Sequence, residues 1–101
     1  MKAFIQFWEE SELGWGVRPD GCSLHLEEIH YKKFIKSVYS KRDNVVPNEY
    51  DRIKGDLLEV EISKSLFDEL LLNDGSLRLP QHSTNNLINF GEIKLENELN
   101  D

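Results

Sequence analysis

The chain has 101 residues, of which 39% are hydrophobic and 31% are charged. This length favours one domain with one hydrophobic core, because a second domain would have too little surface left to bury. Nineteen acidic and twelve basic residues give a net charge of −7, which disfavours direct binding to nucleic acid or to anionic membranes. We expect a single domain over residues 1–95, followed by an acidic frayed tail over residues 96–101.

Cysteine content and hydropathy indicate in which cellular compartment the protein is expected. Cys22 is the only cysteine, so an internal disulfide cannot form and a reducing environment fits. No apolar run approaches the ~20 residues of a membrane-spanning helix, and the N-terminal segment becomes acidic at Glu9 before a signal peptide could be completed. We therefore expect a cytoplasmic protein.

The first half of the chain predicts a strand, a hairpin and the longest helix. Apolar and polar side chains alternate over residues 2–8, as a strand requires. Residues 15–17 and 22–26 flank the sequence Arg-Pro-Asp-Gly at residues 18–21, which favours a hairpin turn. An amphipathic helix is predicted over about 27–41, because its apolar residues recur at helical spacing. These residues are Tyr31, Phe34, Ile35 and Val38.

The second half of the chain predicts shorter elements. A loop is expected to reach Gly55, and a half-buried strand with a solvated acidic face follows at residues 58–62. A short helix at about 64–73 would begin at Ser63 or Ser65. Further strands are expected at residues 77–79, 87–90 and 93–95, with a polar loop at residues 81–86. Together these elements predict an α+β fold with a small, mainly antiparallel sheet.

The spacing of Cys22, His25 and His30, with His82 as a fourth ligand, superficially resembles that of a zinc site. In a strand, however, Cys22 and His25 point to opposite faces of the sheet. We therefore interpret Cys22 as a core residue and the histidines as surface or packing residues, and we expect neither a metal nor a cofactor. A small enzyme that uses His25, His30 and Cys22 is the less favoured alternative to a protein without catalytic activity.

The distribution of charge suggests a partner-binding surface. Residues 27–42 contain five basic and two acidic residues, whereas residues 43–75 contain three basic and nine acidic ones. This polarity either reflects ordinary solvated faces or an acidic surface for a basic protein partner. Trp15, between two glycines, is either a core residue or a binding anchor. The expected partner-binding residues are Trp15, Arg18, Asp20, Asp43, Glu49, Tyr50, Asp51, Asp56, Glu59 and Glu61.

The sequence WGVRPDGCSLHL at residues 15–26, the basic helix and VPNEY at residues 46–50 resemble small uncharacterised bacterial and phage-associated proteins. In size and charge the chain is also similar to phage-encoded inhibitors of host defence, among them anti-CRISPR proteins. This similarity implies an inhibitor that docks on a basic, nucleic-acid-handling protein in a bacterial or phage-infected cytosol. The alternatives are a regulatory, immunity or antitoxin-type subunit, or a homodimer that pairs the strand edges at residues 77–79 and 93–95.

Overall fold

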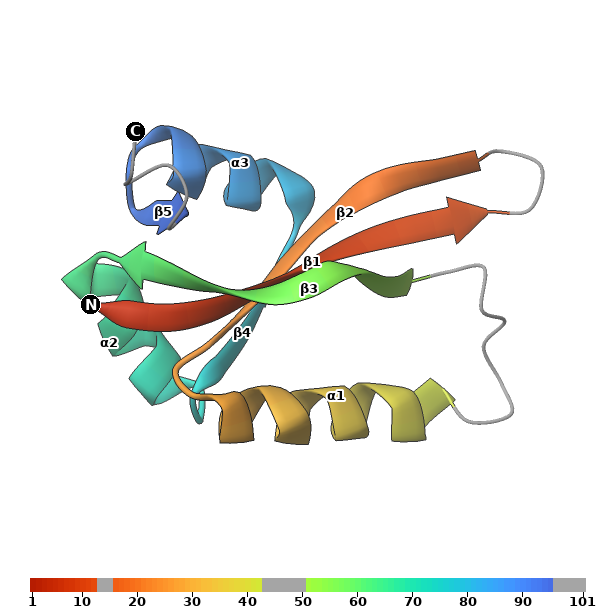
Figure 1. Ribbon diagram of the computed structural model, residues 1–101, viewed down its shortest axis with the longest axis horizontal. Coiled ribbons are helices and arrows are strands. Elements are labelled where there is room, and N and C mark those ends of the chain that lie inside the picture. Colours follow the sequence, from red (N-terminus) through yellow and green to blue (C-terminus); the bar gives the residue numbers. More distant parts are fainter. Residues whose placement is uncertain (13–15, 43–50, 96–101) are drawn as a thin grey trace.

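The computed structural model describes residues 1–12, 16–42 and 51–95. It has a mixed α+β fold, as predicted, with five strands and three helices among these residues (Figure 1). The elements in chain order are β1 (Lys2–Glu12), β2 (Gly16–His25), α1 (Glu28–Arg42), β3 (Asp51–Ile62), α2 (Lys64–Leu72), β4 (Ser76–Leu79), α3 (Gln81–Asn89) and β5 (Ile93–Leu95).

The five strands form one antiparallel sheet in the order β4-β2-β1-β3-β5. β1 is central because both of its faces are buried: Ala3 and Ile5 point to one side of the sheet, and Gln6 and Trp8 point to the other. The edge strands are β4 and β5, the two segments in which exposed strand edges were expected.

Helices lie on both sides of the sheet. α1 runs along one face, where Phe34 makes edge-to-face contacts with Trp8 and His25 (Figure 1). α2 and α3 pack on the opposite face, at the end of the sheet where β5 lies. Cys22 is fully buried in the core on this second face, which confirms its interpretation as a core residue. The buried apolar residues of this core are Ala3, Ile5, Cys22, Leu24, Val60, Ile62, Leu66, Leu70 and Ile93.

Local signals explain where α2 begins and ends. The Ser63 hydroxyl accepts a hydrogen bond from the Leu66 amide at 3.2 Å, which satisfies one of the free N–H groups of the first turn. Asp74 and Gly75 then take positive φ angles of 57° and 90°, a conformation that ends helices. The predicted helix at about 64–73 is therefore confirmed to within one residue.

The turn predicted at residues 18–21 is wrong, because these residues lie inside β2. From Phe7 to Glu9 the chain of β1 advances two residues, while its partners in β2 shift three residues, from Cys22 to Pro19. The extra residue forms a β-bulge, and Gly21 supplies the positive φ of 80° that the bulge uses. β1 and β2 pair antiparallel, and residues 13–15 between them lie outside the described residues.

Two other predictions are also wrong. The expected loop before Gly55 overlaps β3, which begins at Asp51, and the expected loop at 81–86 and strand at 87–90 form the single helix α3. Helix α3 is polar in composition, yet its inward residues Thr84, Leu87 and Ile88 have helical spacing and pack against the core. Tertiary packing thus outweighs the loop-forming tendency of this segment.

Candidate functional site

Bulges interrupt the pairing of β1 on both of its sides, near Gln6 and Trp8. In β2 the bulge contains Gly21, as described above. In β3, Ile5 pairs with Leu58 and Phe7 pairs with Lys54, so residues 55–57 oppose Gln6 alone. Gly55 takes a φ of 74° within this second bulge. Bulges bend and twist strands, and here they shape the middle of the sheet.

The Gln6 side chain holds the bulge in β3. It is buried, and its Nε2 lies 3.1–3.2 Å from the carbonyl oxygens of Phe7, Lys54 and Gly55. Its Oε1 accepts a hydrogen bond of 2.8 Å from the Tyr31 hydroxyl on α1. The Gln6 amide therefore donates hydrogen bonds to carbonyl groups that the bulge removes from the pairing of β1 with β3. Through Tyr31 it also connects α1 to β3.

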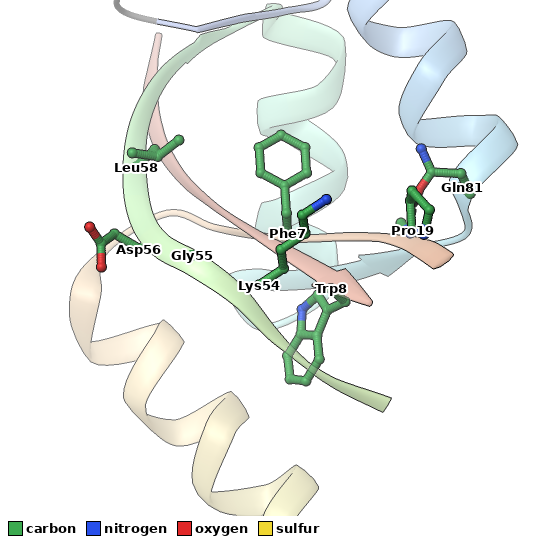
Figure 2. Close-up of a pocket in the computed structure, with 9 residues that line it drawn as sticks. Phe7, Trp8, Pro19, Lys54, Gly55, Asp56, Leu58 and Gln81 are labelled. Atoms are coloured by element: carbon green, nitrogen blue, oxygen red, sulfur yellow. Dashed lines mark hydrogen bonds between the residues drawn. The ribbon is translucent and has the colours of Figure 1, made fainter. Parts of the chain in front are cut away.

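A pocket of about 470 Å³ lies between the two bulges (Figure 2). Figure 2 shows the Phe7 ring and the Trp8 indole on opposite sides of the β1 ribbon, as strand alternation requires. At the β2 rim, the Gln81 Oε1 accepts a hydrogen bond of 2.7 Å from the Gly21 amide. The residues that line the pocket are Phe7, Trp8, Pro19, Gly21, Lys54, Gly55, Asp56, Leu58 and Gln81.

The pocket lies where α2 and α3 stop covering the sheet, with Gln81 at the start of α3 on its rim. These helices pack near β5, while β1 and β2 extend well beyond them (Figure 1). The register places the side chains of Phe7, Val17, Pro19, Lys54 and Leu58 on this uncovered side, which we call the open sheet face. Val17 on β2 is 54% exposed and Leu58 on β3 is 43% exposed, so apolar surface from two strands faces solvent here.

On the opposite face, Arg78 brings two predicted binding residues together. Its Nη2 lies 3.2 Å from Asp20 and 3.1 Å from Asp51, and its guanidinium carbon lies 5.2 Å from the centre of the Trp8 ring. Burial raises the pKa of Asp20, and the hydrogen bond and negative charge of Asp51 raise it further. The Arg78 Nη1 also donates to the Leu79 carbonyl at 2.9 Å. This cluster ties β2, β3 and β4 together.

The remaining predicted binding residues are spread over the molecule. Arg18 pairs with Glu10 at 3.0 Å. Glu61, further along β3, accepts a hydrogen bond from the N-terminal ammonium group, which lowers the pKa of this carboxyl. Asp56 and Glu59 are exposed on the same strand. The predicted residues Trp15, Asp43, Glu49 and Tyr50 lie outside the described residues.

A chain of buried hydrogen bonds involves His25. The Trp8 indole N–H donates to the Ser23 hydroxyl at 2.9 Å, and the His25 ring lies 2.7 Å from both the Ser23 and Ser76 hydroxyls. One assignment of the protons gives each of these side chains a hydrogen-bond partner. The Ser23 hydroxyl donates to Nε2 of a neutral His25, and the Nδ1–H of His25 donates to the Ser76 hydroxyl. The Ser76 hydroxyl in turn donates to the His30 carbonyl at 3.4 Å. Burial, with a smaller contribution from His30, lowers the pKa of His25 to about 4.

This arrangement bears on the alternative of a small enzyme. Ser23 and His25 are within hydrogen-bond distance, but both are fully buried, so a substrate has no route to the hydroxyl. Cys22 lies on the other face of the sheet, and burial raises the pKa of its thiol, which opposes formation of a thiolate nucleophile. The chain of hydrogen bonds therefore has the character of a packed structural network.

Residues of the open sheet face were missed as binding residues for an identifiable reason. Lys54 fell in an expected loop, and Pro19 fell in an expected turn. An isolated glycine within a strand indicates a bulge, and both Gly21 and Gly55 carry this signal. Reading these glycines as bulges would have extended β2 and β3 and placed the pocket between them.

Comparison of the chain with family models, curated proteins and solved structures found no match. Among residues 1–12, 16–42 and 51–95, no group of three or more His, Cys, Asp or Glu side chains could hold a metal ion. Within the same described ranges, no helix is both long and apolar enough to cross a membrane. The function must therefore be argued from the site itself.

Proposed function

We propose that this protein is a non-enzymatic protein-binding module, an inhibitor that docks on a larger, basic, nucleic-acid-handling protein. The observation that carries this proposal is the open sheet face, where Pro19 and Leu58 line a pocket and the apolar side chain of Val17 is exposed on the same face. Apolar surface that surrounds a preformed concavity is typical of sites that bind a partner.

The apolar residues of the open sheet face would supply affinity. Full burial of a valine or leucine side chain stabilises a complex by roughly 1.5–3 kcal/mol. In the free protein, Val17 and Leu58 are each already about half buried. Covering these two residues would therefore contribute about 2 kcal/mol in total, before any contribution from the pocket. A few well-packed contacts of this kind dominate the energy of typical protein interfaces.

Electrostatic steering would bring the basic partner to the protein. The net charge of −7 attracts a positively charged protein. This attraction acts within the screening length of the salt solution. Asp20, Asp51 and Glu61 are already paired within the fold, so they contribute to this long-range field more than to new contacts. Steering raises the association rate, while the apolar contacts slow dissociation.

The edge strands favour this proposal over a homodimer that pairs sheet edges. β4 has four residues and is followed by Pro80, and β5 has only three residues. Very short edge strands and an adjacent proline are devices that limit pairing with another chain. A docking face on the sheet surface agrees better with these features than strand addition does.

A salt-dependent pull-down from lysate of the host bacterium tests the proposal. Wild type should retain a basic protein at low salt and less of it at high salt, and Leu58→Asp or Val17→Asp should retain little. The matched control is Leu72→Asp on α2, because Leu72 is 85% exposed but lies outside the open sheet face. Equal retention by all four chains, or retention of no basic protein by wild type, would refute the proposal.

A further inference from the structure

We infer that the pocket on the open sheet face anchors the partner, and that it takes an apolar side chain that lies next to a carboxylate in the partner's sequence. This inference rests on the proposed function and adds the chemistry that the pocket recognises. Three features of the pocket carry it: its fixed shape, its apolar walls and Lys54, since the other charged lining residue, Asp56, points away from Lys54 in Figure 2.

The shape of the pocket is fixed before a partner binds. A Cβ atom at Gly21 would lie 2.0 Å from the Leu79 carbonyl oxygen, so the β2 rim packs tightly against β4. Gln81 bonds to the Gly21 amide at the same rim, and buried Gln6 bonds to the Lys54 and Gly55 carbonyls at the other. A preformed pocket loses little conformational freedom on binding, which increases the affinity that its contacts can provide.

The walls of the pocket suit an apolar side chain. Phe7, Pro19 and Leu58 come from three adjacent strands and surround a volume of about 470 Å³. This volume lies within the usual range for small-ligand sites, roughly 300–1,000 Å³, and exceeds that of one aromatic side chain. An aromatic or branched side chain and its neighbouring residue would therefore fit together.

The charge of Lys54 determines which kind of residue should lie next to the apolar side chain in the partner's sequence. It pairs with Phe7 across the strands, and its side chain extends on the same side of the sheet as the Phe7 ring (Figure 2). Within the described residues the Lys54 ammonium has no carboxylate partner, whereas Arg52 on the same strand pairs with Glu9 at 2.7 Å. A basic surface brought against this face would repel Lys54 unless it offered a carboxylate there.

Two small probes separate the apolar and charged contributions. N-acetyl-L-phenylalanine carries an aromatic ring and a carboxylate, and N-acetyl-L-phenylalaninamide carries the same ring without the charge. Titrated into the ¹⁵N-labelled full chain, both should shift the amide signals of Phe7, Gly55 and Leu58. The carboxylate should bind about two- to fivefold more tightly than the amide, as a solvent-accessible ion pair allows.

Variants then assign each contribution to a residue. Lys54→Gln should make the two affinities equal, while Lys54→Arg keeps the difference. Leu58→Asp should weaken binding of both probes, and Leu58→Ala provides a milder form of the same change in case the aspartate disturbs folding. Equal binding of the two probes to wild type would overturn the inference. So would signal shifts near Leu26 and Phe67, which line a different pocket formed by residues of α1 and α2.

The inference and the proposed function can fail separately. If wild type and Lys54→Glu retain the same basic partner equally well in the pull-down, the pocket is not the anchor, although the protein still binds a partner. If wild type retains no basic partner, the proposed function fails, whatever the probes bind.

Discussion

The buried His25 makes the stability of the fold sensitive to mild acid. Its pKa is about 4 in the folded protein, against 6.5 for an unperturbed histidine. Because the folded pKa is the lower one, the unfolded chain binds the proton first. The stability linked to neutral His25 is fully present above pH 6.5 and is lost as the pH falls toward 4.

The size of this loss follows from the two pKa values. At pH 5 the difference corresponds to about 2 kcal/mol of lost stability, and the limit well below pH 4 is about 3 kcal/mol. A small domain has only about 5–15 kcal/mol of stability, so the loss is large enough to measure. The physical cause is the environment between α1 and the sheet, where the imidazole is fully buried against Tyr31 and Phe34.

Urea unfolding at a series of pH values between 7.5 and 5 measures the effect. Other groups also titrate in this range of pH. The pKa of Asp20 is raised in the folded protein, so its protonation favours the folded state and opposes the loss of stability caused by His25. The comparison is therefore made between wild type, His25→Gln and His82→Gln, in which His82 is an exposed control. Wild type and His82→Gln should lose about 2 kcal/mol more than His25→Gln over this range. Equal losses in all three chains would refute the reasoning.

Other predictions concern the two bulges and can be measured by thermal or urea unfolding. Gly21→Ala should lower the free energy of unfolding by about 3 kcal/mol or more, because the new Cβ meets the Leu79 carbonyl and φ is positive. The Cβ of Gly55→Ala meets open space, so this substitution should lower the free energy of unfolding by only about 1–2 kcal/mol. Equal costs at the two glycines would contradict the described packing. Gln6→Leu should cost about 1–3 kcal/mol, because it leaves carbonyl groups of the bulge without a donor. Tyr31→Phe removes one hydrogen bond to Gln6 and should cost about 1 kcal/mol, so a larger loss than for Gln6→Leu would count against the proposed role of Gln6.

The sequence predicts the elements whose own residues determine them. The spacing of Tyr31, Phe34 and Ile35 predicts α1, and Ser63 with Gly75 delimits α2. Alternation correctly predicts that Cys22 lies in the core on the face opposite His25. In each of these cases neighbours within a few residues decide the structure.

Predictions fail where distant contacts decide the structure. Pro19 and Gly21 favour a turn locally, but β1 pairs with β2 on both sides of the bulge and keeps them in a strand. Helix α3 forms because Thr84 and Leu87 pack against the core, which its polar composition does not reveal. The pocket requires bulges in two strands that lie more than 30 residues apart in the chain, at Gly21 and Gly55, and so it could not be predicted from either segment alone.

The central claim is that charge steers a basic partner to the protein and that the open sheet face then holds it. Rate constants for the partner captured in the pull-down, measured with wild type and Leu58→Asp over a range of salt concentrations, test this claim most directly. We predict that the association rate falls with salt for both chains and that Leu58→Asp chiefly raises the dissociation rate. A wild-type dissociation rate in Leu58→Asp, or an association rate that does not change with salt, would contradict the account.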